Sequence, residues 1–289
     1  MIKKGIILAG GIGSRMSPVT KAVNKQLLPL YDKPLFFYPL SVLMLAKIKD
    51  ILIIVNKGQI NQFKKVLPNG NNLGIKITYA EQEKPKGLPD AFIIGEKFIG
   101  KNSVALILGD NFFFGHNLTK KLLQCSNFSK GAKIFLYPVK NPSLYGVATI
   151  NKKNEVIGIL EKPKKTKSNL AVTGLYFFDN SVISLSKALR PSKRKEIEIV
   201  DLLNKYRIKK KLSAETIGRG SAWLDTGSIE DFNSTSNFVA AIENRQGYKI
   251  GCIEEIAFNN KWVNNQKIKK SMNFYGNCKY SKYLSSLIN

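Results

Sequence analysis

Residues 5–15 read GIILAGGIGSR, and this stretch decides the fold class. Its first five residues form a short apolar run typical of a buried strand, and a glycine-rich segment with Ser14 and Arg15 follows at once. Glycine lets the main chain come close to an anion, and successive backbone N–H groups can point at it. The planar guanidinium of Arg15 adds a fixed positive charge that suits a polyphosphate. The stretch therefore predicts a strand that leads into a phosphate-binding loop.

Two common phosphate loops do not fit this segment. A Walker A loop needs Gly-Lys followed by Ser or Thr, and that tripeptide is missing. The dinucleotide-binding fingerprint needs a third glycine at the start of a helix. Counted from Gly11, Met16 stands at that position, and Pro18 delays any helix. Taken alone, the glycine segment could also be a plain strand-to-loop turn.

The rest of the chain alternates strand and helix patterns. Apolar, β-branched runs predict strands at 51–55, 75–79, 104–108, 133–137 and 173–178. Helical patterns predict helices at 34–47, 59–67, 90–98, 117–126, 180–189, 198–209 and 229–244. This alternation predicts an α/β fold with a doubly wound, Rossmann-like sheet that is mixed but mainly parallel and carries helices on both faces. Residues 141–165 differ, because two β-patterned segments flank a polar turn, and they predict a small antiparallel insert beside the main sheet.

Composition narrows the classes of protein. A chain of 289 residues can bury a large core. It has no run of eighteen apolar residues, so we expect no membrane partner. The three cysteines are odd in number and widely spaced, which favours neither a disulfide framework nor a zinc site. A reducing cytoplasm is the predicted location.

The formal net charge of +26 invites a nucleic-acid interpretation. Only six of the 46 basic residues are arginines, however, and the lysines are scattered along the whole chain. Readers of specific nucleic-acid sequences favour arginine and aromatic platforms. We therefore expect no specific nucleic-acid partner, although the charge would draw an anionic nucleotide toward the protein.

Several further motifs follow the glycine loop in a fixed order. They include KQLLP at 25–29, LGDN at 108–111, YGV at 145–147, EKP at 161–163, AVTGLYF at 171–177, AWLDTG at 222–227 and EEIA at 254–257. Together with the loop they resemble the sugar-phosphate nucleotidyltransferases, and within that family they are similar to the glucose-1-phosphate thymidylyltransferases. The resemblance covers about residues 1 to 260 with aligned spacing. Many motifs in order are far more specific than any single one.

Two aspartates far apart in the sequence are candidate metal ligands. Asp110 follows the run at 104–108, so it lies at the carboxyl end of a strand, where α/β sheets bind ligands. Alone, Asp110 could instead cap a helix and Asp225 could be a turn residue. The resemblance implies that the pair binds one Mg²⁺, which takes carboxylate oxygens together with substrate phosphates.

The resemblance also implies a reaction and its residues. The reaction is transfer of a thymidylyl group from dTTP to glucose 1-phosphate, which gives dTDP-glucose and pyrophosphate and begins the supply of dTDP-rhamnose for cell-envelope polysaccharide. Arg15 and Lys162 are the implied catalytic residues. The implied nucleotide-binding residues are Gly10, Gly11, Gly13, Ser14, Arg15, Lys25, Gln26, Gln82 and Gly87. The implied sugar-phosphate-binding residues are Asn111, Tyr145, Gly146, Glu161, Lys162 and Val172.

The same resemblance divides the chain and suggests regulation. It implies a nucleotidyltransferase core at 1–240, a C-terminal helical packing or regulatory segment at 241–289, and a homotetramer. A second nucleotide site, which would give feedback control, is implied at Gly115, His116, Arg219, Glu255 and Ile256. His116, the only histidine, could equally be structural.

Two departures from the family pattern leave specificity open. Pro89 and Asp90 replace a usual Ala-Gln near the expected base pocket, which leaves open whether the nucleotide carries thymine or uracil. Asn259 replaces an arginine expected near the second site, which leaves feedback inhibition undecided. The alternatives are a uridylyltransferase or another sugar-1-phosphate nucleotidyltransferase, a catalytically dead nucleotide-sensing module, and a basic nucleic-acid protein.

Overall fold

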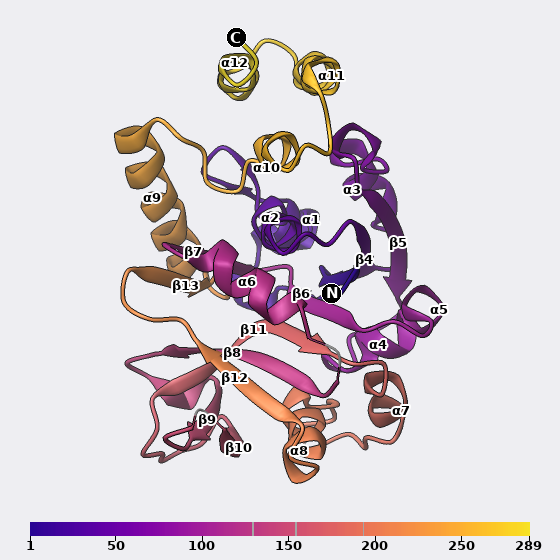
Figure 1. Cartoon of the computed structure of the whole chain (residues 1–289), viewed down its shortest axis with the longest axis vertical. Coiled ribbons are helices and arrows are strands. Elements are labelled where there is room, and N and C mark those ends of the chain that lie inside the picture. The colour runs from indigo at the N-terminus through magenta and orange to yellow at the C-terminus, as the bar shows by residue number, and fades with distance from the viewer. Residues whose placement is uncertain (129, 154, 193) are drawn as a thin grey trace.

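The computed structural model of the chain describes residues 1–128, 130–153, 155–192 and 194–289. Within these residues a nine-stranded sheet crosses the molecule in the order β10-β9-β11-β6-β1-β4-β5, and β8 and β12 continue it from β11 (Figure 1). Its strands are β1 (Lys4–Leu8), β4 (Asp50–Asn56), β5 (Lys76–Gln82), β6 (Val104–Leu108), β8 (Ala132–Pro138), β9 (Gly146–Ile150), β10 (Val156–Glu161), β11 (Leu170–Phe178) and β12 (Leu212–Thr216). Two small ribbons pair β2 (Pro29–Leu30) with β3 (Lys33–Pro34) and β7 (Asn111–Gly115) with β13 (Ser221–Asp225).

Four neighbouring strands of this sheet are parallel and nearly level. Lys4 of β1 lies opposite Val104 of β6 on one side and Asp50 of β4 on the other, and Asp50 lies opposite Lys76 of β5. Their carboxyl ends therefore meet at one edge. In open α/β sheets, this edge is where ligands bind. The segments that follow β1, β4, β5 and β6 all start there.

Helices cover both faces of the sheet, as the alternating pattern predicts. They are α1 (Val19–Ala22), α2 (Phe37–Leu45), α3 (Ile60–Val66), α4 (Asp90–Ile94), α5 (Glu96–Ile99), α6 (Leu118–Ser126), α7 (Val182–Lys187), α8 (Ile199–Ile208), α9 (Ile229–Gln246), α10 (Ile253–Asn259), α11 (Asn265–Tyr275) and α12 (Lys279–Ser286). Helices α2, α3, α6 and α10 belong to the hydrophobic cluster on one face, and α4, α7 and α8 belong to the cluster on the other. The predicted doubly wound, mainly parallel α/β fold is confirmed.

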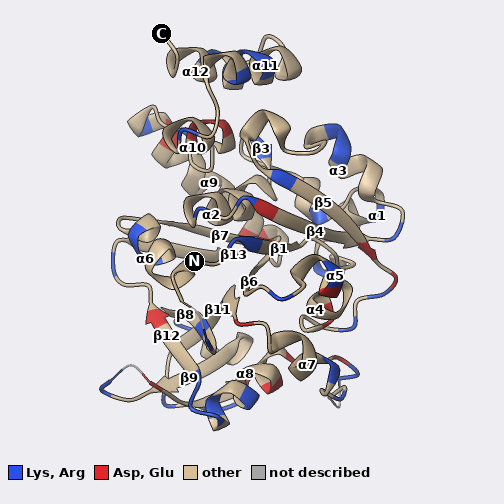
Figure 2. Cartoon of the chain, turned by 45° about the vertical axis from the view of Figure 1, so that its right-hand side comes forward, with Lys and Arg blue, Asp and Glu red and all other residues tan. Residues whose placement is uncertain are grey.

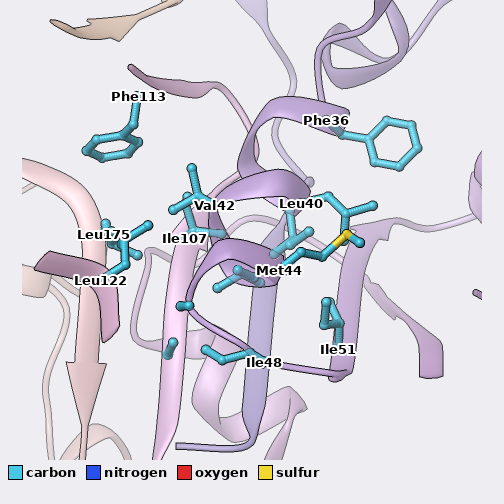
Figure 3. Packing of buried hydrophobic residues seen from close by; sticks show 14 of the residues in the cluster. Phe36, Leu40, Val42, Met44, Ile48, Ile51, Ile107, Phe113, Leu122 and Leu175 are labelled. Carbon is cyan, nitrogen blue, oxygen red and sulfur yellow. The ribbon is translucent and has the colours of Figure 1, made fainter. Parts of the chain in front are cut away.

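The central strands are apolar on both sides. Ile7 of β1 packs into the cluster under α2, and its neighbour Ile6 packs into the cluster under α4 and α8. Figure 3 shows the first cluster, where Met44 of α2 lies among apolar side chains that include Ile51 of β4 and Ile107 of β6. The burial of apolar surface stabilises such a core most, by about 25 cal/mol for each Å² removed from water.

Two local predictions need correction. Residues 141–165 do form an antiparallel hairpin, with Leu160 opposite Val147. The hairpin is not beside the sheet, however, because Ala148 of β9 pairs with Leu170 of β11 and the hairpin extends the sheet. The helix predicted at 90–98 is divided into α4 and α5 at Gly95, a residue type that weakens helices.

The C-terminal helices lie at one end of the molecule (Figure 1). Helices α11 and α12 pack with residues of α10 in a small separate cluster around Ile268 and Leu284. Helix α9 continues past residue 240, where the predicted core ends, so that division stays a prediction. Short 3₁₀ turns lie at Ser14–Met16, Lys25–Leu27, Asn71–Leu73 and Pro142–Leu144.

The basic residues are spread over the molecule. Figure 2 shows Lys and Arg on helices, strands and loops from one end of the chain to the other. This spread gives no support to a dedicated nucleic-acid surface. None of the helices in the described residues is both long and apolar enough to cross a membrane.

Candidate active site

A cavity of about 360 Å³ opens at the carboxyl edge of the parallel strands. Residues from both predicted substrate sites line it: Gly10, Arg15, Gln82, Gly87, Tyr145, Gly146, Glu161, Lys162, Val172 and Asp225. Positions more than 200 residues apart in the sequence thus share one cavity. The structure places these predicted residues around one cavity, and what each one binds stays a prediction.

The two ends of the glycine loop, Gly10 and Arg15, line this cavity. A side chain at Gly10 would overlap the Gln82 amide, since an added Cβ would lie 2.0 Å from Gln82 Nε2. Gly11 has a φ of 130°, a conformation that residues with a Cβ rarely adopt. The loop then enters the 3₁₀ turn that contains Ser14 and Arg15. Gly10 is thus needed for the close approach of Gln82 and Gly11 for the backbone shape, while the predicted approach to a phosphate stays a prediction.

The β7–β13 ribbon brings the two predicted metal ligands together. Asp225 of β13 lies opposite Asn111, the residue after Asp110. Thr226 donates to the Asp110 carbonyl oxygen from its backbone N–H (3.1 Å) and from its hydroxyl (2.8 Å). Burial and, second to it, the negative charge of Asp110 raise the pKa of Asp225 to about 7. The two carboxyl groups are therefore electrostatic neighbours.

Asp110 is held ionised by a buried lysine. Lys25 Nζ lies 2.5 Å from Asp110 Oδ2, and the Lys25 side chain is only 9% exposed. Burial alone would raise the pKa of Asp110, but the charge and hydrogen bond of Lys25 outweigh it and the pKa is lowered. Lys25, which the resemblance assigns to the triphosphate, is the counter-ion of Asp110 in this structure.

Asn111 orients the Asp110 carboxyl group. Its Oδ1 accepts hydrogen bonds from Trp223 Nε1 (2.6 Å) and from the Gly174 backbone N–H (3.0 Å). Its Nδ2 is therefore left to donate, and it donates to Asp110 Oδ1 at 3.1 Å. Asn111 is only 1% exposed. The predicted sugar contact of Asn111 is untested, whereas these contacts give it a part in fixing the aspartate.

The opposite wall is more exposed and carries unpaired and loosely paired charges. Lys162 follows β10, is exposed, and has a φ of 41°, an uncommon conformation for a residue with a Cβ. Its backbone N–H donates to the Tyr145 carbonyl oxygen (3.0 Å). Burial raises the pKa of Glu161, and the charge of Glu198 adds to this shift.

Arg194 is a lining residue that sequence reasoning missed. Its guanidinium donates to Glu198 (2.8 Å) and to Glu161 (3.3 Å). The signal in the sequence was an arginine four residues before a glutamate, which is the spacing of an ion pair along a helix. Arg194 adds a second cation beside Glu161, on the side of the cavity predicted to bind the sugar phosphate.

The other predicted nucleotide and metal residues are not part of the cavity lining. Gly11, Gly13, Ser14, Lys25, Gln26 and Asp110 do not line it. Gln26 is 4% exposed, and its Oε1 has no hydrogen-bond partner among the described residues. An unsatisfied buried acceptor of this kind is costly and calls for a donor.

A second cavity of about 250 Å³ lies between α2, α6 and α10. Gly115, Glu255 and Ile256 line it, as expected for the predicted regulatory site. His116 and Arg219 are not among its lining residues. The structure thus brings together three of the five predicted residues, and regulation through this cavity stays a prediction.

The donor set fits a divalent cation that also binds substrate. No group of three or more His, Cys, Asp or Glu side chains is placed to hold a metal in the described ranges. Asp110 and Asp225 supply two carboxyl groups whose mutual repulsion a cation would relieve. An ion with only two protein ligands must take the rest from water or substrate phosphates, which is the usual situation of Mg²⁺.

The comparisons with known proteins agree with this geometry. The sequence matches the nucleotidyl transferase family over residues 4–242. The chain belongs to this family. It is 47% identical over 285 residues to a glucose-1-phosphate thymidylyltransferase of Neisseria meningitidis, and the match covers 99% of each chain. It is 44% identical, again with 99% of each chain covered, to the enzyme of the same name from Mycolicibacterium smegmatis.

A solved structure supports the same placement. A UDP-glucose pyrophosphorylase complexed with UDP-glucose superposes with a TM-score of 0.73 at 27% identity, covering 85% of this chain and all of that one. The family predicted from the sequence is confirmed, and the chain is a nucleotidyltransferase. Nucleotidyltransferases of this family generally use a divalent metal ion.

Proposed function

We propose that this enzyme transfers a thymidylyl group from dTTP to α-D-glucose 1-phosphate, giving dTDP-glucose and pyrophosphate. The observation that carries the proposal is the single cavity lined by Gly10 and Arg15 of the glycine loop together with Asp225 and Lys162. A triphosphate and a sugar phosphate can meet only where their repulsion is neutralised. The relatives from Neisseria meningitidis and Mycolicibacterium smegmatis, similar over 99% of the chain, are named for this activity.

The residues divide the work between the two substrates. Arg15 packs against Gly227, where an added Cβ would lie 2.9 Å from its guanidinium, and its charge acts on the neighbouring Asp225. In our proposal it neutralises charge that develops on the triphosphate. Lys162, with Arg194 beside it, grips the phosphate of the sugar, and Glu161 accepts hydrogen bonds from sugar hydroxyls. No general base is needed, because the attacking phosphate oxygen is already charged at neutral pH.

Asp110 and Asp225 would hold the Mg²⁺ ion in this proposal. When bound, the ion supplies positive charge for the phosphates and fixes their geometry. Lys25 keeps Asp110 ionised, and Asn111 keeps its carboxyl group in one orientation. These two residues therefore prepare the ligand.

Pyrophosphate release tests the proposal directly. Purified enzyme is mixed with glucose 1-phosphate, Mg²⁺ and, in separate reactions, dTTP, UTP, dCTP or ATP. We expect turnover with dTTP to exceed that with UTP. A preference for UTP would replace the thymidylyl activity by a uridylyl one, and tight binding of dTTP without turnover would indicate a nucleotide-sensing module.

Two further parts of the proposal concern the oligomeric state and the cellular location of the enzyme. We expect a homotetramer, which light scattering of the purified enzyme would detect. We also expect action in the cytoplasm, where dTTP and glucose 1-phosphate are available, with dTDP-glucose passed on toward dTDP-rhamnose. Added dTDP-rhamnose should inhibit the enzyme if the cavity beside α10 is regulatory, and variants at Glu255 should then weaken the inhibition.

A further inference from the structure

Asn56 holds the glycine loop from the neighbouring strand. It is the last residue of β4, and its Oδ1 accepts a hydrogen bond from the Gly11 backbone N–H at 2.9 Å. Its Nδ2 donates to the Gly11 carbonyl oxygen, also at 2.9 Å. The β1–β4 pairing ends one step earlier, where the Ala9 N–H donates to the Ile54 carbonyl oxygen. The side chain of Asn56 thus continues the strand pairing beyond the end of β1.

These two bonds fix which way the Asn56 amide faces. A backbone N–H can only donate and a carbonyl oxygen can only accept, so Oδ1 must face the Gly11 N–H and Nδ2 must face the Gly11 carbonyl oxygen. The reversed amide would place donor against donor and acceptor against acceptor. The orientation of Asn56 therefore follows from the backbone.

Asn56 in turn fixes the amide of Gln82, which lines the cavity. Gln82 Nε2 donates to Asn56 Oδ1 at 3.0 Å, because an oxygen there can only be met by a donor. Gln82 is 6% exposed, and among the described residues nothing donates to its Oε1. With one Nε2–H held by Asn56, the Gln82 Oε1 is left as an acceptor for a ligand.

We propose that Asn56 is a positioning residue that sets base selection, by locking Gln82 so that it presents a hydrogen-bond acceptor to the nucleotide. This rests on the proposed function, in which Gln82 reads the base. Thymine and uracil carry an N3–H donor that meets an acceptor. Cytosine has a bare N3 lone pair, which the locked Oε1 repels. The lock thus selects keto pyrimidines, with no direct contact between Asn56 and the base.

The contacts of Asn56 also determine which backbone N–H groups of the loop remain available to a phosphate. The Gly11 N–H is used by Asn56, so it is not available to an anion. The backbone N–H groups of residues 12–15 have no acceptor in the described part of the chain. N–H groups at the start of a helical turn are suited to phosphate. Asn56 therefore fixes the loop at Gly11 and leaves the following amides for the triphosphate.

The test compares kcat/KM for dTTP and dCTP in the wild-type enzyme and in variants at Asn56. Asn56→Leu keeps the volume but removes both polar groups, so Gln82 is free to turn its amide. We expect the dTTP preference over dCTP to fall by about tenfold, the value of one lost discriminating hydrogen bond. Asn56→Ala, a second variant, should show the same loss.

Asn56→Asp keeps the oxygen that accepts from Gln82 but adds a negative charge. Its carboxylate still accepts from Gln82 Nε2 and from Gly11, so the dTTP preference should stay within about twofold of the wild-type value. Its lost bond to the Gly11 carbonyl oxygen and its negative charge should lower kcat/KM for dTTP itself. Asn180→Ala is the matched control, because Asn180 is half-buried and its amide holds the backbone carbonyl oxygens of Gly100 and Asn102, outside the cavity.

Binding measurements test the role of Asn56 independently of the proposed reaction. Calorimetric affinities for dTTP and dCTP give the same ratio even if the wild-type enzyme shows no turnover, in which case only the proposed function fails. A ratio that is equal in wild type and Asn56→Leu, or that falls as much in Asn56→Asp, would overturn the role of Asn56. The role of Asn56 would be supported if Asn56→Leu lost the preference for dTTP over dCTP while its unfolding midpoint changed no more than that of Asn180→Ala.

Discussion

The two halves of the cavity are built differently. On the proposed nucleotide side, polar groups at the ends of parallel strands are buried or half-buried and joined by hydrogen bonds, as Lys25 is to Asp110 and Asn56 is to Gly11. On the sugar side, Lys162 is exposed, and Arg194 is 44% exposed with carboxylates around it. In our proposal the nucleotide half is therefore held by hydrogen bonds before substrate arrives, whereas the sugar half leaves charge exposed to an incoming anion.

This difference has an energetic consequence. Charge-assisted hydrogen bonds in a buried setting contribute about 1.5–3 kcal/mol, whereas exposed ion pairs contribute about 0–1 kcal/mol. Substitutions in the nucleotide half should therefore affect the chemical step most. Substitutions in the sugar half should act mainly on the binding of glucose 1-phosphate.

The largest expected effect is at the aspartate pair. Asp225→Asn removes a carboxylate that would bind Mg²⁺, and we expect kcat to fall by about 10²–10³-fold or more. The thermal unfolding midpoint should not fall, because the substitution also removes the repulsion between Asp225 and Asp110. Pyrophosphate release and calorimetry measure the two effects, with Asp201→Asn on the exposed face of α8 as the control. Nearly normal turnover in Asp225→Asn would exclude it as a metal ligand.

Arg15 should come next. Arg15→Ala removes a charge that acts mainly in the transition state, and we expect a loss of about 2.7–4 kcal/mol, by analogy with the loss of an oxyanion donor. The loss should appear in kcat more than in the KM for dTTP. Steady-state kinetics decide, and Arg190→Ala, at an exposed position away from the cavity, is the control. A change in KM alone would mean that Arg15 only binds the ground state.

Lys162 tests the sugar half. Lys162→Ala should raise the KM for glucose 1-phosphate by roughly ten- to a hundredfold, the value of one charge-assisted contact. The KM for dTTP should change little. Lys164→Ala, two residues along the same loop and also exposed, should have neither effect. Equal losses in the two lysine variants would show that general positive charge, and no specific grip, is what matters.

The smallest effect should be at Arg194. Because its ion pairs with Glu198 and Glu161 are partly exposed, Arg194→Ala should raise the KM for glucose 1-phosphate by only about twofold to fivefold. The effect should shrink as salt is added, since screening weakens exposed charge pairs. Initial rates at low and high ionic strength measure this. A larger loss than in Lys162→Ala would reverse the proposed order of the two cations.

Local patterns in the sequence were enough for the fold. Apolar runs and helical periodicity follow from burial, and they located the strands of the main sheet except β12 (Leu212–Thr216). They could not locate the β7–β13 ribbon, because its pairing joins residues more than 100 positions apart. The approach of Asp225 to Asp110 depends on that ribbon. It was predicted only because the motifs resemble a known family, and not from the spacing of the residues.

The neutral parts of the site were harder to find than the charged ones. Asp110 drew attention as a carboxylate at the carboxyl end of a strand. Asn56 ends β4 at the same edge of the sheet, so the same rule would have pointed to it. An uncharged amide gives no signal of its own, however, and its role appears only when the Gly11 peptide is seen beside it. Arg194 was hidden in a similar way, among the many basic residues of its loop.

Location of a metal ion in crystals of the enzyme with Mn²⁺ and a non-hydrolysable dTTP analogue is the most direct test. Anomalous scattering identifies Mn²⁺ without relying on the protein density. We predict one ion bound by both Asp110 and Asp225, with the triphosphate along the amides of residues 12–15. An ion bound elsewhere, or a triphosphate that does not touch the glycine loop, would contradict the proposed active site.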